Sequence, residues 1–326
     1  MRLSEFGERN LVEMARRIFR KGGRIVVGIG DDAAAIEING KCIVATTDML
    51  VQSTHFPEGT SPRLMGRKSV AVNLSDLAAM GARPLGLIFS VGLRRDLDVR
   101  FAREMIIGMN ESAARYGTFV VGGDIDESDE VVISGSAFGI CDRKNLMRRS
   151  GARPGDVLAV TGYVGNASAG LDVIKKEGNM KKHVLLVRSL FDPVPRVREG
   201  TALAESGTVT AAIDISDSLA SNLWQISRES GVKITLDVER VPIHPALERY
   251  GRETGKDPLE FALFGGEDLE LLVTVRQDKL RKARAVLAGC QTPLTAIGKV
   301  ERGRGVFAVR NGKAEKLPDR GYEHFR

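Results

Sequence analysis

Residues 25–48 read IVVGIGDDAAAIEINGKCIVATTD, and this stretch carries the clearest indication of the fold class. It predicts a strand over residues 25–29 and two further strands over 33–38 and 41–46, separated by Asn39-Gly40. An Asn-Gly pair between two β-rich runs is the strongest short signal for a hairpin. A hairpin pairs its strands antiparallel, so the sequence favours an α+β fold over a purely parallel sheet.

The same stretch contains Gly28-Ile29-Gly30-Asp31-Asp32-Ala33, which matches the dinucleotide pattern G-x-G-x-x-A. That pattern works only when a helix follows and its N-terminus holds the pyrophosphate. Here a hairpin follows, and two adjacent aspartates would repel the anion. We therefore reject a dinucleotide site, and we find no P-loop, no protein-kinase signature and no G-x-S-x-G elbow in the chain.

Strands and helices alternate along the rest of the chain. Helices are expected at 4–20, 62–80 and 97–115, and a strand over 118–121 is expected to end at Gly122-Gly123-Asp124. The segment RRSGARPG at 148–155 has the composition of a boundary. The prediction is therefore two domains, 1–147 and 148–326, the second with its own α/β pattern and a hairpin at Asn311-Gly312.

The chain has 326 residues and a formal net charge of +6, from 48 Lys+Arg against 42 Asp+Glu. Its composition excludes long disorder, and no apolar run reaches the roughly 20 residues of a membrane span. The first residues lack the apolar core of a signal peptide, and three widely spaced cysteines fit reduced thiols, so we expect a cytoplasmic protein. Aromatic residues make up only 5%, which argues against RNA binding.

Acidic residues recur at strand ends beside Gly, Ser or Thr, in surroundings that otherwise look buried. They are Asp31, Asp32, Asp48, Asp124, Asp214, Asp217, Glu267 and Asp268, and Asp76 lies inside the apolar helix 62–80. A buried carboxylate without a partner is costly and would normally protonate. Hard oxygen ligands favour Mg²⁺ or Ca²⁺, and Mg²⁺ completes its coordination with water and phosphate oxygens.

Each signal also has a simpler structural explanation. Asp214 and Asp217 could be helix N-caps, Gly122-Gly123 could be a plain turn, and His55 could be a polar loop residue. Asp76 has the weakest such explanation, because helix interiors disfavour Asp. The residues alone therefore indicate a metal-dependent enzyme that handles phosphate.

Several of these stretches resemble the ordered motifs of the thiamine-monophosphate kinase family. They are GIGDDAAAI, ATTDMLVQSTHF, GRKSVAVNLSDLAAMGARP, VVGGD, GARPGD, DISDSL and FALFGGEDLELL. The family belongs to a superfamily with aminoimidazole ribonucleotide synthetase and selenophosphate synthetase. This chain departs from the family pattern at Ser218, where Gly is usual, and at Leu269, where an aromatic residue is common. It also departs at Ile106, where some members have a Tyr that contacts the nucleotide, and at Asp124, where other members have Asn.

The resemblance implies ATP-dependent phosphorylation of thiamine monophosphate to thiamine diphosphate by direct in-line transfer. It implies a homodimer formed by the N-terminal domains, and a C-terminal domain that closes the cleft. The residues it implies as Mg²⁺ ligands are Asp32, Thr46, Thr47, Asp48, Asp76, Asp124, Asp214 and Asp217. It implies Gly123, Asp124, Arg149 and Ser216 as ATP contacts, and His55, Glu267 and Tyr322 as thiamine monophosphate contacts. Among these, Asp48, Asp76, Asp217 and Arg149 would be catalytic.

Two alternatives stay open at this point. One is another ATP-dependent enzyme of the superfamily, above all one resembling aminoimidazole ribonucleotide synthetase. Selenophosphate synthetase fits poorly because the first cysteine is Cys42, and the hydrogenase-maturation relative needs a C-terminal Cys where this chain ends in Phe325-Arg326. The other alternative is a non-catalytic nucleotide-binding protein, which would be expected to have lost acidic residues.

Overall fold

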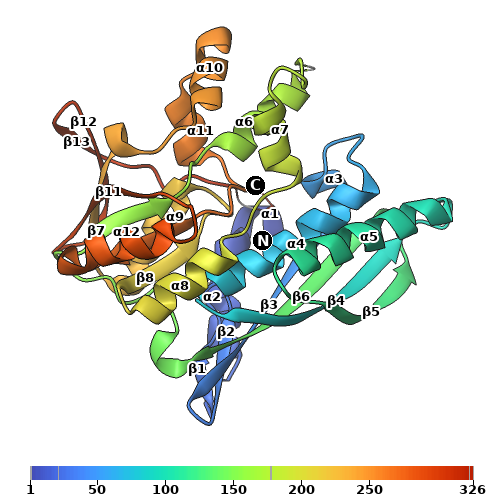
Figure 1. Cartoon of the computed structure of the whole chain (residues 1–326), viewed down its shortest axis with the longest axis horizontal. Coiled ribbons are helices and arrows are strands. Elements are labelled where there is room, and N and C mark those ends of the chain that lie inside the picture. The colour runs from blue at the N-terminus through green and yellow to red at the C-terminus, as the bar shows by residue number, and fades with distance from the viewer. Residues whose placement is uncertain (1, 21, 177, 323, 326) are drawn as a thin grey trace.

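The computed structural model describes residues 2–20, 22–176, 178–322 and 324–325. It contains two β-sheets, one built from the first half of the chain and one from the second, each with helices packed on it (Figure 1). The chain crosses from the first sheet to the second between residues 143 and 156. The α+β class predicted from the sequence is confirmed.

The N-terminal sheet has six strands in the order β1-β2-β3-β6-β4-β5, and only β4 and β5 pair in parallel. Its strands are β1 Ile25–Val27, β2 Ala34–Ile38, β3 Lys41–Val51, β4 Arg83–Leu93, β5 Val120–Glu127 and β6 Val132–Asp142. The predicted hairpin joins β2 to β3, and Asn39 (φ 50°) and Gly40 (φ 78°) both take the left-handed conformation that a tight hairpin turn needs.

Two long helices cover one face of this sheet, namely α4 Pro62–Ala79 and α5 Val99–Arg115 (Figure 1). The Ser61 side chain accepts from the Leu64 N–H and caps α4. The two helices cross closely because each has a glycine at the contact. A Cβ on Gly66 would lie 2.1 Å from the Met105 carbonyl oxygen, and one on Gly108 would lie 2.0 Å from that of Arg63.

The N-terminal segment differs from its prediction. The single helix expected over 4–20 is two helices, α1 Leu3–Phe6 and α2 Glu8–Ile18, separated at Gly7, whose φ is 78°. The expected apolar face of this segment is not buried in the chain, since Met14 and Ile18 are exposed. A short helix, α3 Gln52–His55, follows β3.

The C-terminal sheet has seven strands in the order β13-β12-β9-β11-β7-β10-β8. Its strands are β7 Val157–Thr161, β8 Val209–Asp214, β9 Lys233–Asp237, β10 Leu271–Val275, β11 Leu294–Glu301, β12 Gly305–Arg310 and β13 Lys313–Lys316. The helices are α6 Asn166–Lys175, α7 Val184–Phe191, α8 Val197–Ser206, α9 Leu219–Ser230, α10 Pro245–Thr254, α11 Pro258–Phe264 and α12 Leu280–Ala288. Single 3-10 turns lie at Arg143–Asn145, Val238–Arg240 and Gln277–Lys279.

The two faces of the C-terminal sheet belong to different cores. Leu158, Val160 and Ile213 lie in one core with α9 on one face. Residues of the opposite face, such as Val273, share a second core with α8, α12 and the apolar residues of α4. The second core therefore runs from one sheet to the other, and it fixes α4 against the C-terminal domain.

Candidate active site

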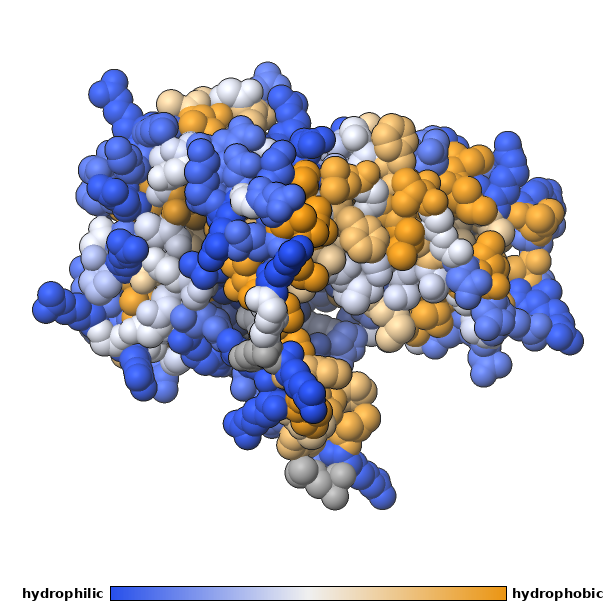
Figure 2. All heavy atoms as spheres, turned by 90° about the horizontal axis from the view of Figure 1, so that it is seen from below, coloured by the Kyte–Doolittle hydropathy of each residue, from blue (hydrophilic) through white to orange (hydrophobic). Residues whose placement is uncertain are grey.

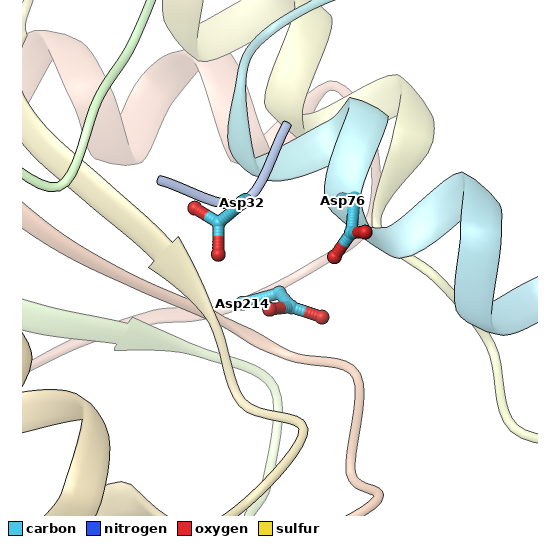
Figure 3. A group of neighbouring side chains, drawn as sticks. All are labelled: Asp32, Asp76 and Asp214. Atoms are coloured by element: carbon cyan, nitrogen blue, oxygen red, sulfur yellow. The ribbon is translucent and has the colours of Figure 1, made fainter. Parts of the chain in front are cut away.

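Three aspartates from distant parts of the chain meet between the two sheets. Asp32 precedes β2, Asp76 lies on α4, and Asp214 ends β8. Each offers a carboxylate oxygen, and these oxygens all lie within 4.8 Å of one another. Figure 3 shows the three carboxylates around a common space. We call Asp32, Asp76 and Asp214 the aspartate triad.

Neighbouring hydroxyl groups orient two members of the triad. Thr46 Oγ1 donates to Asp76 Oδ2 at 2.5 Å, and Ser75 Oγ donates to Asp214 Oδ2 at 2.6 Å. Asp32 Oδ2, by contrast, is buried without a hydrogen-bond partner. An orphaned carboxylate oxygen facing two other carboxylates is costly unless a cation is bound there.

The repulsion among the carboxylates of the triad also indicates a bound cation. Burial, with Asp48 and the other two triad carboxylates close by, raises the pKa of Asp76 well above its usual range. Burial and the charge of Asp32 raise the pKa of Asp214 to about 8. Carboxylates held so closely repel one another unless they are protonated or share a cation. Oxygen ligands of this kind suit Mg²⁺, so the residues present fit the metal that the sequence predicts.

The predicted ligands on β3 divide between the two faces of the sheet, because side chains alternate along a strand. Thr46 and Asp48 share the face that carries Asp76, and burial followed by the charge of Asp217 raises the pKa of Asp48 to about 6. Thr47 lies on the opposite face, where its hydroxyl donates to the Gly135 carbonyl at 2.8 Å. Only the backbone of Thr47 can therefore provide a ligand on the face of the sheet on which the triad lies.

Arg149 lies in the segment that connects the two sheets and reaches the triad from there. Its guanidinium donates to Asp32 Oδ1 from Nη2 at 2.7 Å and to Gln225 on α9 at 2.6 Å. Its backbone N–H donates to Asp31 Oδ1 at 3.1 Å. Burial alone would lower the pKa of Arg149. The charge of Asp32 and the hydrogen bonds to it have the larger effect, so the pKa of Arg149 is raised. A fixed cation therefore lies at one side of the triad.

The DISD motif, residues 214–217, does not cap a helix with either aspartate. The N-cap of α9 is Ser218, whose hydroxyl accepts from the Ser221 N–H at 3.0 Å. Asp214 and Asp217 are thus available as ligands, and burial raises the pKa of Asp217. Ser216 is exposed, and its carbonyl accepts from the Glu267 N–H at 2.7 Å.

Gly123 and Asp124 do not join the triad within one chain. The strand expected to end before them continues, and β5 runs through both to Glu127. Strand registers place Gly123 beside Phe89 of β4, Phe89 beside Gly135 of β6, and Gly135 beside Asp48. Three strand spacings, roughly 14 Å, thus separate Gly123 from Asp48. Position 123 requires glycine because β4 lies close to it: a Cβ on Gly123 would lie 2.0 Å from the Phe89 carbonyl oxygen.

The residues expected to contact thiamine monophosphate lie together. Lys68 of α4 pairs with Glu267 Oε1 at 2.6 Å and donates to the His55 carbonyl at 3.3 Å. The ring of His324 lies 5.7 Å from that of His55 and 4.9 Å from that of Tyr322, measured between centroids. His55, Glu267 and Tyr322 are thus connected through two residues that the sequence analysis did not select.

A sequence signal existed for Lys68 but not for His324. Lys68 is a charged residue inside an apolar helix, and the cost of burying an unpaired charge, which drew attention to the carboxylates, applies to it as well. His324 has no informative spacing to another histidine, and only the fold of the closing segment brings it beside His55.

Comparisons with known proteins identify the family of the chain. Residues 30–141 match the model of the AIR synthase related protein N-terminal domain, and residues 153–311 match that of its C-terminal domain. A thiamine-monophosphate kinase from Pyrococcus horikoshii is 37% identical over 298 residues, covering 91% of each chain. The chain belongs to the thiamine-monophosphate kinase family. The homologue from Aquifex aeolicus is 33% identical over the full length of both chains.

A solved structure described as "AaThiL complexed with AMPPCP and TMP" has a TM-score of 0.89 to this chain. It is 33% identical, and the alignment covers 99% of each chain. The two-domain architecture of the family is therefore that of this chain. Within the described residues, no helix is long and apolar enough to cross a membrane.

Proposed function

We propose that this protein transfers the γ-phosphate of ATP to thiamine monophosphate and forms thiamine diphosphate. The observation that carries the proposal is the aspartate triad, in which both domains supply buried carboxylates and one oxygen has no partner. The family membership supports the substrates, since the neighbouring structure is described as a complex with AMPPCP and TMP. The proposed site lies where the two domains meet.

The reaction we propose is a direct in-line displacement. A phosphate oxygen of thiamine monophosphate forms a bond to the γ-phosphorus, the bond to the β,γ-bridging oxygen breaks, and ADP leaves with that electron pair. The attacking oxygen is already anionic, so no side chain has to remove a proton from it. When bound by the triad with Thr46, Asp48 and Asp217, Mg²⁺ would neutralise the phosphates and stabilise charge on the transferring group. Asp124 lies away from the triad within one chain and would add a ligand only from a second copy.

The chain's own residues supply binding and orientation. Arg149 is a fixed cation whose side chain is 20% exposed, so it can contact the triphosphate, with Gly123, Asp124 and Ser216 as further ATP contacts. Thr46 and Ser75 hold triad carboxylates in place through hydroxyl donation. His55, Glu267 and Tyr322 are the proposed contacts of thiamine monophosphate. Tyr322 is 52% exposed, which leaves its ring accessible for stacking.

We also propose that residues 1–147 form the ATP, metal and dimerisation domain and that residues 148–326 close the cleft. The face of the N-terminal sheet opposite α4 and α5 carries exposed apolar side chains (Figure 2). Strand registers place Met49 of β3, Ile88 of β4 and Val121 of β5 on this face. Exposed apolar patches of this kind are typical of interfaces. A second copy seated on this face would form the expected homodimer and cover the edge that holds Gly123 and Asp124.

An ADP-release assay with MgATP tests the proposal against its alternatives. Thiamine monophosphate, thiamine and an aminoimidazole ribonucleotide precursor are supplied separately, with EDTA as the control for the metal. We expect ADP release and thiamine diphosphate only with thiamine monophosphate and Mg²⁺. Turnover with the aminoimidazole precursor alone would favour the other superfamily reaction. ATP binding without turnover of any substrate would favour a non-catalytic nucleotide-binding protein.

A further inference from the structure

Lys68 is a buried cation in the middle of α4, with only 2% of its side chain exposed. Its ammonium pairs with Glu267 Oε1 at 2.6 Å and also donates to the His55 carbonyl oxygen at 3.3 Å. Burying an ammonium group is costly unless it is paired and hydrogen-bonded. The lysine therefore requires both of these contacts, which come from opposite domains.

Glu267 is held in an unusual backbone conformation. Its φ of 67° lies in the left-handed region, which a non-glycine residue rarely adopts. Its N–H donates to the Ser216 carbonyl at 2.7 Å, and a Cβ on the preceding Gly266 would lie 2.3 Å from that same carbonyl oxygen. The loop that carries Glu267 is thus pressed against the DISD motif on one side and against Lys68 on the other.

We propose that Lys68 is a positioning residue for thiamine monophosphate, acting through Glu267 and the turn at His55. The inference rests on the proposed function. The ion pair fixes the direction of the Glu267 side chain, which stays 35% exposed and accessible to a substrate. The hydrogen bond to the His55 carbonyl fixes the end of α3. The Lys68 ammonium thus sets the distance between His55 of the N-terminal half and Glu267 of the C-terminal half. Side chains ordered before binding lose less entropy when substrate arrives.

Lys68→Met tests this role, because methionine keeps an unbranched apolar side chain in the buried position and removes the charge. We expect the KM for thiamine monophosphate to rise at least tenfold while the KM for ATP changes less than twofold. Binding of thiamine monophosphate, measured by isothermal titration calorimetry without turnover, should weaken to the same extent. Lys68→Gln serves as a second variant if Lys68→Met does not give folded protein by gel filtration and circular dichroism.

Arg67→Met is the matched control. Arg67 is the neighbouring cation on α4, and it also reaches the C-terminal domain through Asp192 at 3.3 Å, but its partners, Glu111 and Asp192, are not among the proposed substrate contacts. Removing it should leave the KM for thiamine monophosphate unchanged.

A double-mutant cycle with Glu267→Gln separates positioning from general damage. Because Lys68 acts on Glu267 as well as on the turn at His55, the double variant should lose less binding of thiamine monophosphate than the two single losses added together. Additive effects, an equal rise in both KM values, or a folded Lys68 variant with normal binding would overturn the inference. A wild-type protein that binds thiamine monophosphate but does not phosphorylate it would instead refute the proposed function, and the binding cycle would still test Lys68.

Discussion

Replacing Asp214 by Asn should stabilise the metal-free protein while abolishing its activity. Asp214 is 1% exposed, and burial together with Asp32 raises its pKa from 3.8 to about 8. In the unfolded chain the group ionises near its ordinary pKa, so between about pH 4 and pH 8 the folded protein binds more protons. The free energy of unfolding therefore falls as pH rises through this range.

The size of the effect follows from this difference. At pH 7 the pH lies about three units above the ordinary pKa of the carboxyl, so the group is ionised in the unfolded chain. In the folded protein the carboxyl is still largely protonated at this pH. At about 1.4 kcal/mol per unit, the cost to the folded state is about 4 kcal/mol. Asparagine has no such cost, and its amide oxygen can still accept from the Ser75 hydroxyl, which lies 2.6 Å from Asp214 Oδ2.

The assay is thermal unfolding in EDTA at pH 7 and pH 4, followed by titration with Mg²⁺. We expect the melting temperature of Asp214→Asn to exceed that of wild type by roughly 5 °C or more at pH 7 and to match it near pH 4. Mg²⁺ should stabilise wild type and not the variant, and turnover should fall at least about a hundredfold. Asp129→Asn, at an exposed position, is the control and should change nothing. A variant that melts below wild type at pH 7, or that keeps its response to Mg²⁺, would refute this reasoning.

Three further outcomes are expected. Asp48→Asn and Asp76→Asn should each reduce turnover at least about a hundredfold with the fold intact by circular dichroism, and near-normal activity in both would argue against a metal cluster. Because the pKa of Asp48 is raised to about 6 and that of Asp214 to about 8, protons should compete with Mg²⁺. The Mg²⁺ concentration for half-maximal activity should therefore rise as pH falls from 8 to 6, and a flat profile would contradict this. Val121 is 66% exposed on the face of the N-terminal sheet opposite α4 and α5, and Val121→Asp should convert the dimer to monomers. Light scattering measures the mass, and an unchanged mass would show that this face is not the interface.

Local sequence signals predicted many of the elements around the site. The Asn-Gly hairpin, the capped helix α4 and the strand that ends at Asp214 all depend on neighbouring residues, and all are present. Other elements were missed. The strand β11 contains Gly298 and a register shift beside it, which weaken the alternating pattern, yet it pairs between β9 and β7 inside the sheet. The helix α11 was also not predicted.

The acidic residues separate into groups that sequence alone could not distinguish. Asp268 accepts hydrogen bonds from the N–H groups of Gly165 and Ala167, so its carboxylate stabilises the start of α6, a helix far away in the chain. The capping explanation offered for Asp214 and Asp217 is wrong, because Ser218 is the cap of α9. Capping depends on backbone geometry at a turn, and an Asp near a helix start fits either role.

The sequence by itself determined the kinds of group available, namely acidic residues beside glycine-rich turns, one aspartate within an apolar helix, and the ordered motifs of a kinase family. The tertiary structure decided which of them meet. Residues 32, 76 and 214 converge because α4 packs against both sheets and carries its aspartate to the end of β8, and the same helix carries Lys68 to Glu267. Contacts between residues so far apart depend on how whole elements pack, and no local pattern in the chain specifies that.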